Sequence, residues 1–243
     1  MIQRELDIQT DDGLMNTFIT YPELDRKYPV IIFYMDAPGK REELHDMAVR
    51  LGTAGYYVVL PNLYYREDRD FVFNPTEKGR EYMFKLMNSL STSMVDADTQ
   101  SILNFLEGEE QASAGPMGCV GYCMSGPFVF SAASTFSPRM QASASFHGIR
   151  LFTDHPESPH LRARDIDGEI YFGLAAVDEW APPEMITALE DYLLLTDIDW
   201  RVEWYPDTKH GFVFPLRGDD IYHKVSAERH WERLMDMFER RLK

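Results

Sequence analysis

The segment that most constrains the fold is the run Cys119-Val120-Gly121-Tyr122-Cys123-Met124-Ser125-Gly126. An apolar stretch ends at Tyr122, and a helix-compatible stretch follows from Pro127 to Ser134. Cys123 must therefore turn sharply between a strand and a helix. Small residues stand two positions before it and two after it, which lets the strand and the helix pack closely. This layout is typical of a nucleophile elbow, which holds a reactive side chain on a strained turn at the edge of a sheet.

An acid and a histidine follow in the order that such a site requires. The stretch 169–177 reads as a buried strand, and Asp178 comes directly after it, where open α/β sheets place their functional groups. The stretch 200–205 is predicted as another strand, and His210 lies in the expected loop 206–212. The order nucleophile, acid, base is that of the α/β-hydrolase arrangement. Glu179 remains a competing candidate for the acid.

With these residues the sequence resembles the dienelactone hydrolases (carboxymethylenebutenolidases), nearly end to end. The segments that match are Gly121-Tyr122-Cys123, Asp178, Lys209-His210-Gly211-Phe212, Asp36 after the strand 30–35, the segment 52–66, and Arg80-Glu81. The resemblance implies one α/β-hydrolase domain over residues 1–243, a mostly parallel sheet with helices on both faces. It also implies hydrolysis of a small-molecule ester or lactone through a thioacyl cysteine, with a Cys-His-Asp triad and no cofactor.

The chain departs from the family pattern at two positions. The family usually has Glu where this chain has Asp36, and it has a second substrate-binding Arg where this chain has Phe214. Asp36 is expected to modulate the thiol, the alternative being a loop carboxylate that pairs with Arg41. Arg80 is expected to bind a substrate carboxylate, since Arg grips carboxylates with two hydrogen bonds; the alternative is a solvated ion pair. Arg217 lies three residues beyond Phe214 and is a candidate replacement.

Other residues are expected to complete the site. Backbone amides of Met124 and Ala37 are predicted to form an oxyanion hole. His147 ends an apolar strand and is interpreted as a pocket-lining or hydrogen-bonded structural residue, not a second base. Aromatic residues on the expected active-site loops favour an apolar or ring-shaped substrate: Tyr64, Tyr65, Trp180, Phe212 and Phe214.

Composition narrows the classes of function. A net charge of −16 argues against nucleic-acid and anionic-membrane partners. The first residues lack the apolar core of a signal peptide, and no apolar run is long enough to span a bilayer. Cys119 and Cys123 are about 13 Å apart along a strand, beyond disulfide reach, which favours a cytoplasmic location. The spacing of Asp154, His155 and His160 matches no standard metal site, so no metal is expected.

Strands and helices are expected to alternate along the chain. The predicted strands follow a hairpin around Asp11-Asp12-Gly13 and cover 30–35, 57–60, 117–122, 142–147, 169–176 and 201–205; the predicted helices cover 41–54, 76–90, 95–107, 127–134, 183–195 and 221–241. Such alternation favours a parallel sheet wrapped by helices. Two other functions stay open: hydrolysis of another activated carbonyl such as a thioester, and a catalytically silent ligand-binding protein. The chain is expected to be a monomer or a small homo-oligomer.

Overall fold

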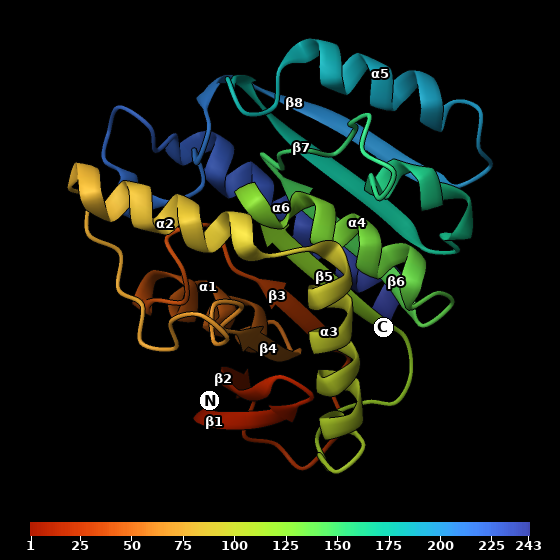
Figure 1. Ribbon diagram of the computed structural model, residues 1–243. Helices are drawn as coiled ribbons and strands as arrows, with labels where there is room; N and C mark the ends of the chain where they lie inside the picture. Colours follow the sequence, from red (N-terminus) through yellow and green to blue (C-terminus); the bar gives the residue numbers. More distant parts are fainter. The chain divides into compact units, whose positions relative to one another are not determined.

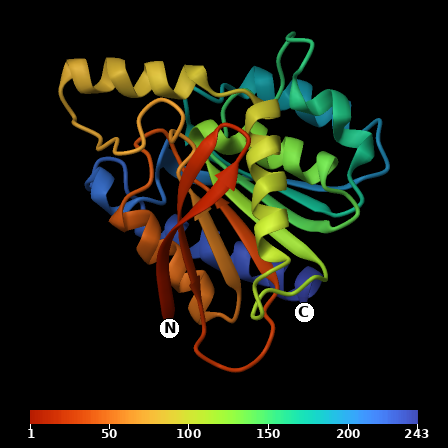
Figure 2. The same cartoon turned by 60° about the horizontal axis from the view of Figure 1, so that its bottom comes forward.

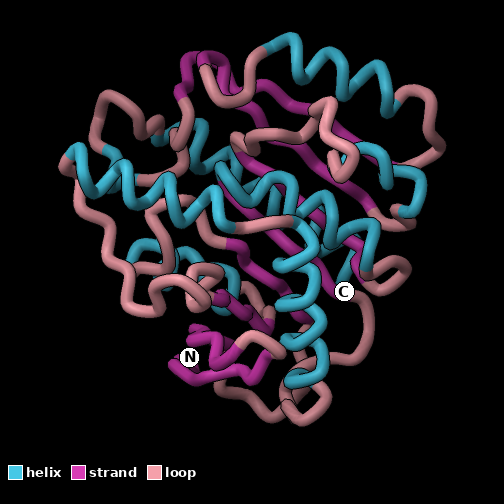
Figure 3. Tube along the Cα trace, viewed as in Figure 1, coloured by secondary structure: helices cyan, strands magenta, loops and turns pink.

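The computed structural model describes all 243 residues, which form two compact units, Met1–Gly115 and Pro116–Lys243. Both units combine strands with helices, as Figures 1 and 3 show. Most neighbouring strands are parallel, and only the N-terminal hairpin and its partner strand pair antiparallel. The predicted α/β class is therefore confirmed.

The first unit is built on four strands. Their order across the sheet is β1 (Ile2–Thr10), β2 (Gly13–Tyr21), β4 (Tyr57–Pro61) and β3 (Val30–Tyr34). The predicted hairpin is present, and Figure 2 shows β1 and β2 as a long twisted pair. Gly13 has a φ of +133°, a conformation that side chains disfavour, so glycine suits this turn. β3 and β4 pair in parallel, as expected of a strand–helix–strand unit.

Three helices belong to this unit: α1 (Glu42–Thr53), α2 (Glu77–Ser89) and α3 (Thr92–Leu106). α1 packs against the sheet, where the Phe18 ring stacks on His45 with centroids 4.2 Å apart. Side-chain caps start the other two helices: Thr76 accepts a hydrogen bond from the Gly79 amide, and Ser91 accepts one from the Met94 amide. These caps satisfy amides that have no partner within the helix.

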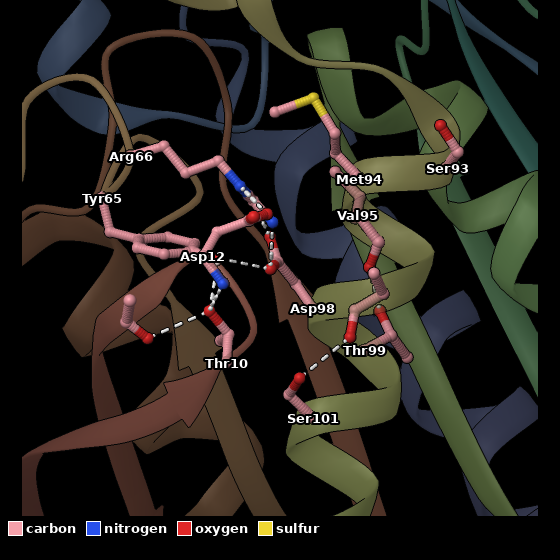
Figure 4. A network of polar contacts seen from close by, with 12 residues as sticks. Thr10, Asp12, Tyr65, Arg66, Ser93, Met94, Val95, Asp98, Thr99 and Ser101 are labelled. Carbon is pink, nitrogen blue, oxygen red and sulfur yellow. Dashed lines mark hydrogen bonds and ion pairs between the residues drawn. The ribbon is translucent and has the colours of Figure 1, made fainter.

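A buried polar network joins the hairpin, the segment after β4 and α3 (Figure 4). Arg66 donates two hydrogen bonds to Asp98, at 2.8 and 2.7 Å, and a third to Asp12 at 2.7 Å. Tyr65 donates to the same Asp98 carboxylate at 2.8 Å and contacts the Thr10 hydroxyl at 2.8 Å. The network ties Tyr65 and Arg66 to α3 and to the hairpin.

The second unit has an all-parallel sheet and three long helices. The strands, in order, are β5 (Met117–Tyr122), β6 (Met140–Phe146), β7 (Glu169–Val177) and β8 (Asp199–Lys209), and the helices are α4 (Gly126–Thr135), α5 (Pro183–Leu193) and α6 (Lys224–Leu242). α4 and α6 cover opposite faces of this sheet (Figure 1). Successive residues of β5 point to opposite faces of the sheet. A Cβ on Gly121 would therefore meet Val129 of α4, and one on Gly118 would meet Phe238 of α6 on the other face.

The predicted end of the last strand was wrong. The stretch 206–209, expected as a loop, continues β8 up to Lys209. The pairing of β7 with β8 shifts register between Ala175 and Val177, and Asp207 has a φ of +59°, so the strand bulges and then resumes with Lys209 opposite Val177. The residues that follow these two positions therefore lie at the same edge of the sheet. A short 3-10 helix, Pro159–Asp165, was not anticipated.

Candidate active site

Cys123 occupies the turn between β5 and α4. Its φ is +56°, in the left-handed region that residues other than glycine rarely adopt. Residues Cys123–Ser125 form a 3-10 turn that leads into α4. The close approach of strand and helix requires Gly121, because a Cβ there would lie 2.7 Å from Val129 Cγ2 and 2.9 Å from Ser125 Cβ. Cys123 is partly exposed whereas Cys119 is buried, and both are free thiols.

His210 and Asp178 are brought together by the resumed pairing of β7 with β8. His210 Nδ1 lies 2.7 Å from Asp178 Oδ2. The other carboxylate oxygen accepts hydrogen bonds from the amides of Trp180, at 2.9 Å, and Ala181, at 3.3 Å. Together, these three hydrogen bonds fix the orientation of the Asp178 carboxylate. Glu179, the competing acid, is exposed.

The electrostatics favour a protonated His210. Burial alone would lower the pKa of His210, but hydrogen bonds to Asp178 and to the Cys123 thiol group outweigh it and raise the pKa to about 10. A neighbouring imidazolium stabilises a thiolate. The site therefore contains a protonated imidazole that bonds to the Asp178 carboxylate and lies beside the Cys123 thiol.

His147 and two predicted substrate-contact residues form a buried wall beside His210. The His147 ring is fully buried, and its centroid lies 4.7 Å from that of His210. Phe212 and Phe214 are equally buried, with ring centroids 5.9 and 5.7 Å from that of His147. These three side chains pack on one another, and their contact with a substrate stays a prediction. The Arg217 guanidinium lies 5.8 Å from the Phe214 ring centroid, on the same loop.

Trp180 and Met124 differ in exposure. Trp180 lies two residues beyond Asp178 and is 44 % exposed, and its predicted contact with a substrate stays a prediction. Met124 lies in the 3-10 turn after Cys123, and its side chain is buried. Sequence reasoning missed one contact of this turn: the Ile149 amide donates a hydrogen bond to the Cys123 carbonyl at 3.0 Å. A backbone contact of this kind leaves no residue-type signal.

Ala37 and Tyr64 interact within the first unit. The Tyr64 hydroxyl donates to the Ala37 carbonyl at 2.9 Å, and the Gly39 amide donates to the Asp36 carbonyl at 2.9 Å. Since N–H and C=O point in opposite directions across a trans peptide, the second bond directs the Ala37 amide away from Gly39. Tyr64 is buried and here supports the loop; its predicted contact with a substrate stays a prediction.

Two charged residues of the first unit have partners of their own. Asp36 is buried and forms an ion pair with Arg41. This pairing is the alternative that the sequence left open for Asp36. Its predicted effect on the thiol stays a prediction. Arg80 is exposed on α2 and donates a hydrogen bond to the Pro75 carbonyl at 2.7 Å. Its binding of a substrate carboxylate likewise stays a prediction.

No group of three or more His, Cys, Asp or Glu side chains is placed to hold a metal ion. None of the helices has both the length and the apolar character needed to cross a membrane.

The chain matches one protein family along most of its length. Residues 15–242 match the family model described as "Dienelactone hydrolase family". A Synechocystis protein named "Putative carboxymethylenebutenolidase" is 24 % identical over 229 residues, which cover 93 % of this chain and 92 % of the relative. A Bradyrhizobium protein named "Probable 2-oxo-3-(5-oxofuran-2-ylidene)propanoate lactonase" is 22 % identical over 230 residues, covering 93 % and 89 %.

Solved structures show the same fold. A crystal structure titled "Putative Dienelactone Hydrolase" from Klebsiella pneumoniae superposes with a TM-score of 0.86 at 22 % identity, covering 98 % of both chains. A metagenomic structure titled "Dienelactone Hydrolase-like Promiscuous Phospotriesterase" gives a TM-score of 0.79 at 18 % identity, covering 100 % of this chain and 99 % of that one.

Proposed function

The chain belongs to the dienelactone hydrolase family, and from that premise we propose that it cleaves a carboxylic ester or lactone through a thioacyl intermediate on Cys123. The observation that supports this most strongly is the 2.7 Å contact between His210 Nδ1 and Asp178 Oδ2, together with the pKa of His210, which its hydrogen bonds to Asp178 and to the Cys123 thiol raise. In this proposal Cys123 is the nucleophile, His210 transfers protons, and Asp178 holds the imidazole in its working tautomer.

The first half of the reaction forms the acyl-enzyme. The Cys123 thiolate attacks the carbonyl carbon, a C–S bond forms, and the carbonyl electron pair moves onto oxygen as a tetrahedral oxyanion. When the oxyanion collapses, the C–O bond to the alcohol part breaks and the His210 imidazolium gives its proton to the leaving oxygen. Since a pKa of about 10 keeps His210 protonated at neutral pH, the acid needed for this step is present from the start.

The second half releases the acid. Neutral His210 now takes a proton from water, and the resulting hydroxide attacks the thioacyl carbon. Collapse of the second oxyanion breaks the C–S bond, which returns the thiolate beside the imidazolium and leaves a carboxylic acid. Asp178 keeps its hydrogen bond to His210 Nδ1 in this scheme and stabilises the imidazolium whenever it forms.

Backbone amides supply the oxyanion hole in this proposal. Met124 follows the nucleophile, as one donor of an elbow does. Ala37 is the second, and two observations support it: its flanking peptides are held by Gly39 and Tyr64, and its own amide donates no hydrogen bond in the structure. A donor that is already oriented and unpartnered costs no reorganisation when the oxyanion forms.

The names of the relatives and one exposed aromatic side chain narrow the substrate class. Carboxymethylenebutenolidase and lactonase are both names for enzymes that open lactones, which favours a lactone or a related ester here. The exposed Trp180, two residues beyond Asp178, favours a substrate with an apolar or ring-shaped group.

Two free thiols suit a reducing compartment, so we infer a cytoplasmic location.

Turnover of an activated aryl ester tests the proposal. Wild-type protein is expected to hydrolyse it, Cys123→Ala to lose that activity, and Cys119→Ala to retain it, because the second thiol is buried away from the base. Full activity in Cys123→Ala would reject the nucleophile. Ligand binding without turnover in the wild type would instead support a silent binding protein.

A further inference from the structure

The loop that follows β6 holds the nucleophile turn in place through its backbone. Its Ile149 amide donates to the Cys123 carbonyl at 3.0 Å. The next contact is steric: a Cβ on Gly126, at the start of α4, would lie 2.7 Å from the Cα of Gly148. Nucleophile turn and loop are therefore in backbone contact, and displacement of one requires displacement of the other.

The same loop begins with an unusual residue. His147 has a φ of +39°, a left-handed conformation that costs energy in a residue other than glycine. Its amide donates to the Gly173 carbonyl of β7 at 2.7 Å, which fixes this conformation against the sheet. The backbone thereby directs the imidazole of His147 toward the loop that contains His210.

The His147 side chain contacts the catalytic base without bonding to it. The two rings meet edge to face, with an interplanar angle of 66°, and Tyr122, Phe212 and Phe214 surround His147 on other sides. Both nitrogens of His147 are buried and make no hydrogen bond. Burial, together with the charge of His210, lowers the pKa of His147 well below its ordinary value, so the ring is neutral. Both nitrogens of His210 stay available to Asp178 and Cys123.

We propose that His147 is a positioning residue, whose ring sets the tilt of His210 while its loop holds Cys123. One short segment then fixes the nucleophile through its backbone and the base through a side chain. This inference rests on the proposed hydrolase function and deepens it. It assigns His147 to the support of the base. Of the two roles that the sequence left open for His147, the hydrogen-bonded structural one was wrong, because neither ring nitrogen has a hydrogen-bond partner.

Two substitutions of His147 distinguish the role of the ring from the role of its nitrogens. His147→Phe keeps a ring and removes the unpaired nitrogens. His147→Asn removes the ring but tolerates the left-handed backbone. The measurements are kcat and KM for an activated aryl ester and the rate at which iodoacetamide alkylates Cys123. His160→Asn is the matched control, because His160 is also buried but packs on Phe152 and Tyr192.

The Asn variant is expected to lose roughly ten- to a hundredfold in kcat, the cost of a misplaced catalytic group, with KM little changed and slower alkylation. The Phe variant is expected to retain wild-type kcat and to melt at the same temperature or higher, because buried unpaired polar atoms destabilise. The control is expected to keep wild-type kcat.

Three results would overturn the positioning role. These are an Asn variant with wild-type kcat, a folded Phe variant as slow as the Asn variant, and loss of folding in His147→Asn and His147→Gln alike, which would make the ring a stability element only. Absence of turnover in the wild type would reject the proposed function instead. The alkylation comparison needs no turnover and would still test the positioning of His210 against Cys123.

Discussion

His210 follows β8 and Asp178 follows β7, and the pairing of Lys209 with Val177 places the two side chains 2.7 Å apart. The bulge at Asp207 makes this pairing possible, since it re-aligns the strands after their register shifts. The acid–base contact is thus a consequence of sheet register, one residue beyond the last paired positions.

This contact predicts unequal effects of substitution. His210→Ala should lower kcat/KM by several orders of magnitude, because the residue moves protons, and Asp178→Asn by less, because it orients and stabilises the ring. Glu179→Gln is the matched control and should have no effect, since Glu179 is exposed. Steady-state kinetics on one activated ester measures all three. A loss confined to Glu179→Gln would require the acid to be reassigned.

The raised pKa of His210 predicts a pH dependence of stability. Its pKa is about 10 in the folded protein against 6.5 for a free histidine, so the folded state binds the proton more tightly. The stabilisation is complete below pH 6.5 and is lost as pH rises through about 10. Urea unfolding of wild type and His210→Gln should show a difference that shrinks from neutral to alkaline pH. If the difference in unfolding free energy between the two proteins grew with pH, the raised pKa would not belong to His210.

The buried network of the first unit predicts a large loss of stability. Arg66→Ala leaves Asp98 buried without its ion-pair partner, which typically costs about 3–5 kcal/mol in unfolding free energy. Arg69→Ala is the control, because its pair with Asp7 is exposed to solvent and such pairs contribute about 0–1 kcal/mol. Denaturant titration compares the two variants. Equal losses of unfolding free energy in the two variants would show that burial does not determine how much an ion pair contributes to stability.

Substrate preference provides a fourth prediction. The resemblance to the family places Phe214 where a second substrate-binding arginine is expected, and a lost charge-assisted contact costs about 1.5–3 kcal/mol. A neutral aryl ester should therefore have a higher kcat/KM than a carboxylated lactone of similar size, and Arg80→Ala should affect only the latter. A strong preference for the carboxylated lactone would instead identify Arg217, which lies beside Phe214, as the replacement.

Much of this arrangement could be predicted from the sequence, because strand ends and turn residues mark it. The turn at Cys123 and the position of Asp178 directly after β7 are as expected. The extent of β8 could not be predicted, since Pro206 is a typical strand breaker and only pairing with β7 shows that the strand resumes. The packing of Phe212 and Phe214 was also hidden, because a loop sequence does not show which side chains turn inward.

Trapping the acyl-enzyme tests the central proposal most directly. After brief mixing of Asp178→Asn protein with a small aryl acetate, acid quenching and peptide mass spectrometry should find one acetyl group on the sulfur of Cys123. The slower deacylation expected of this variant favours accumulation. Cys119 should carry none, because it is fully buried. An acetyl group on Ser125 or on Cys119, or turnover that continues in Cys123→Ala, would contradict a thioacyl mechanism at Cys123.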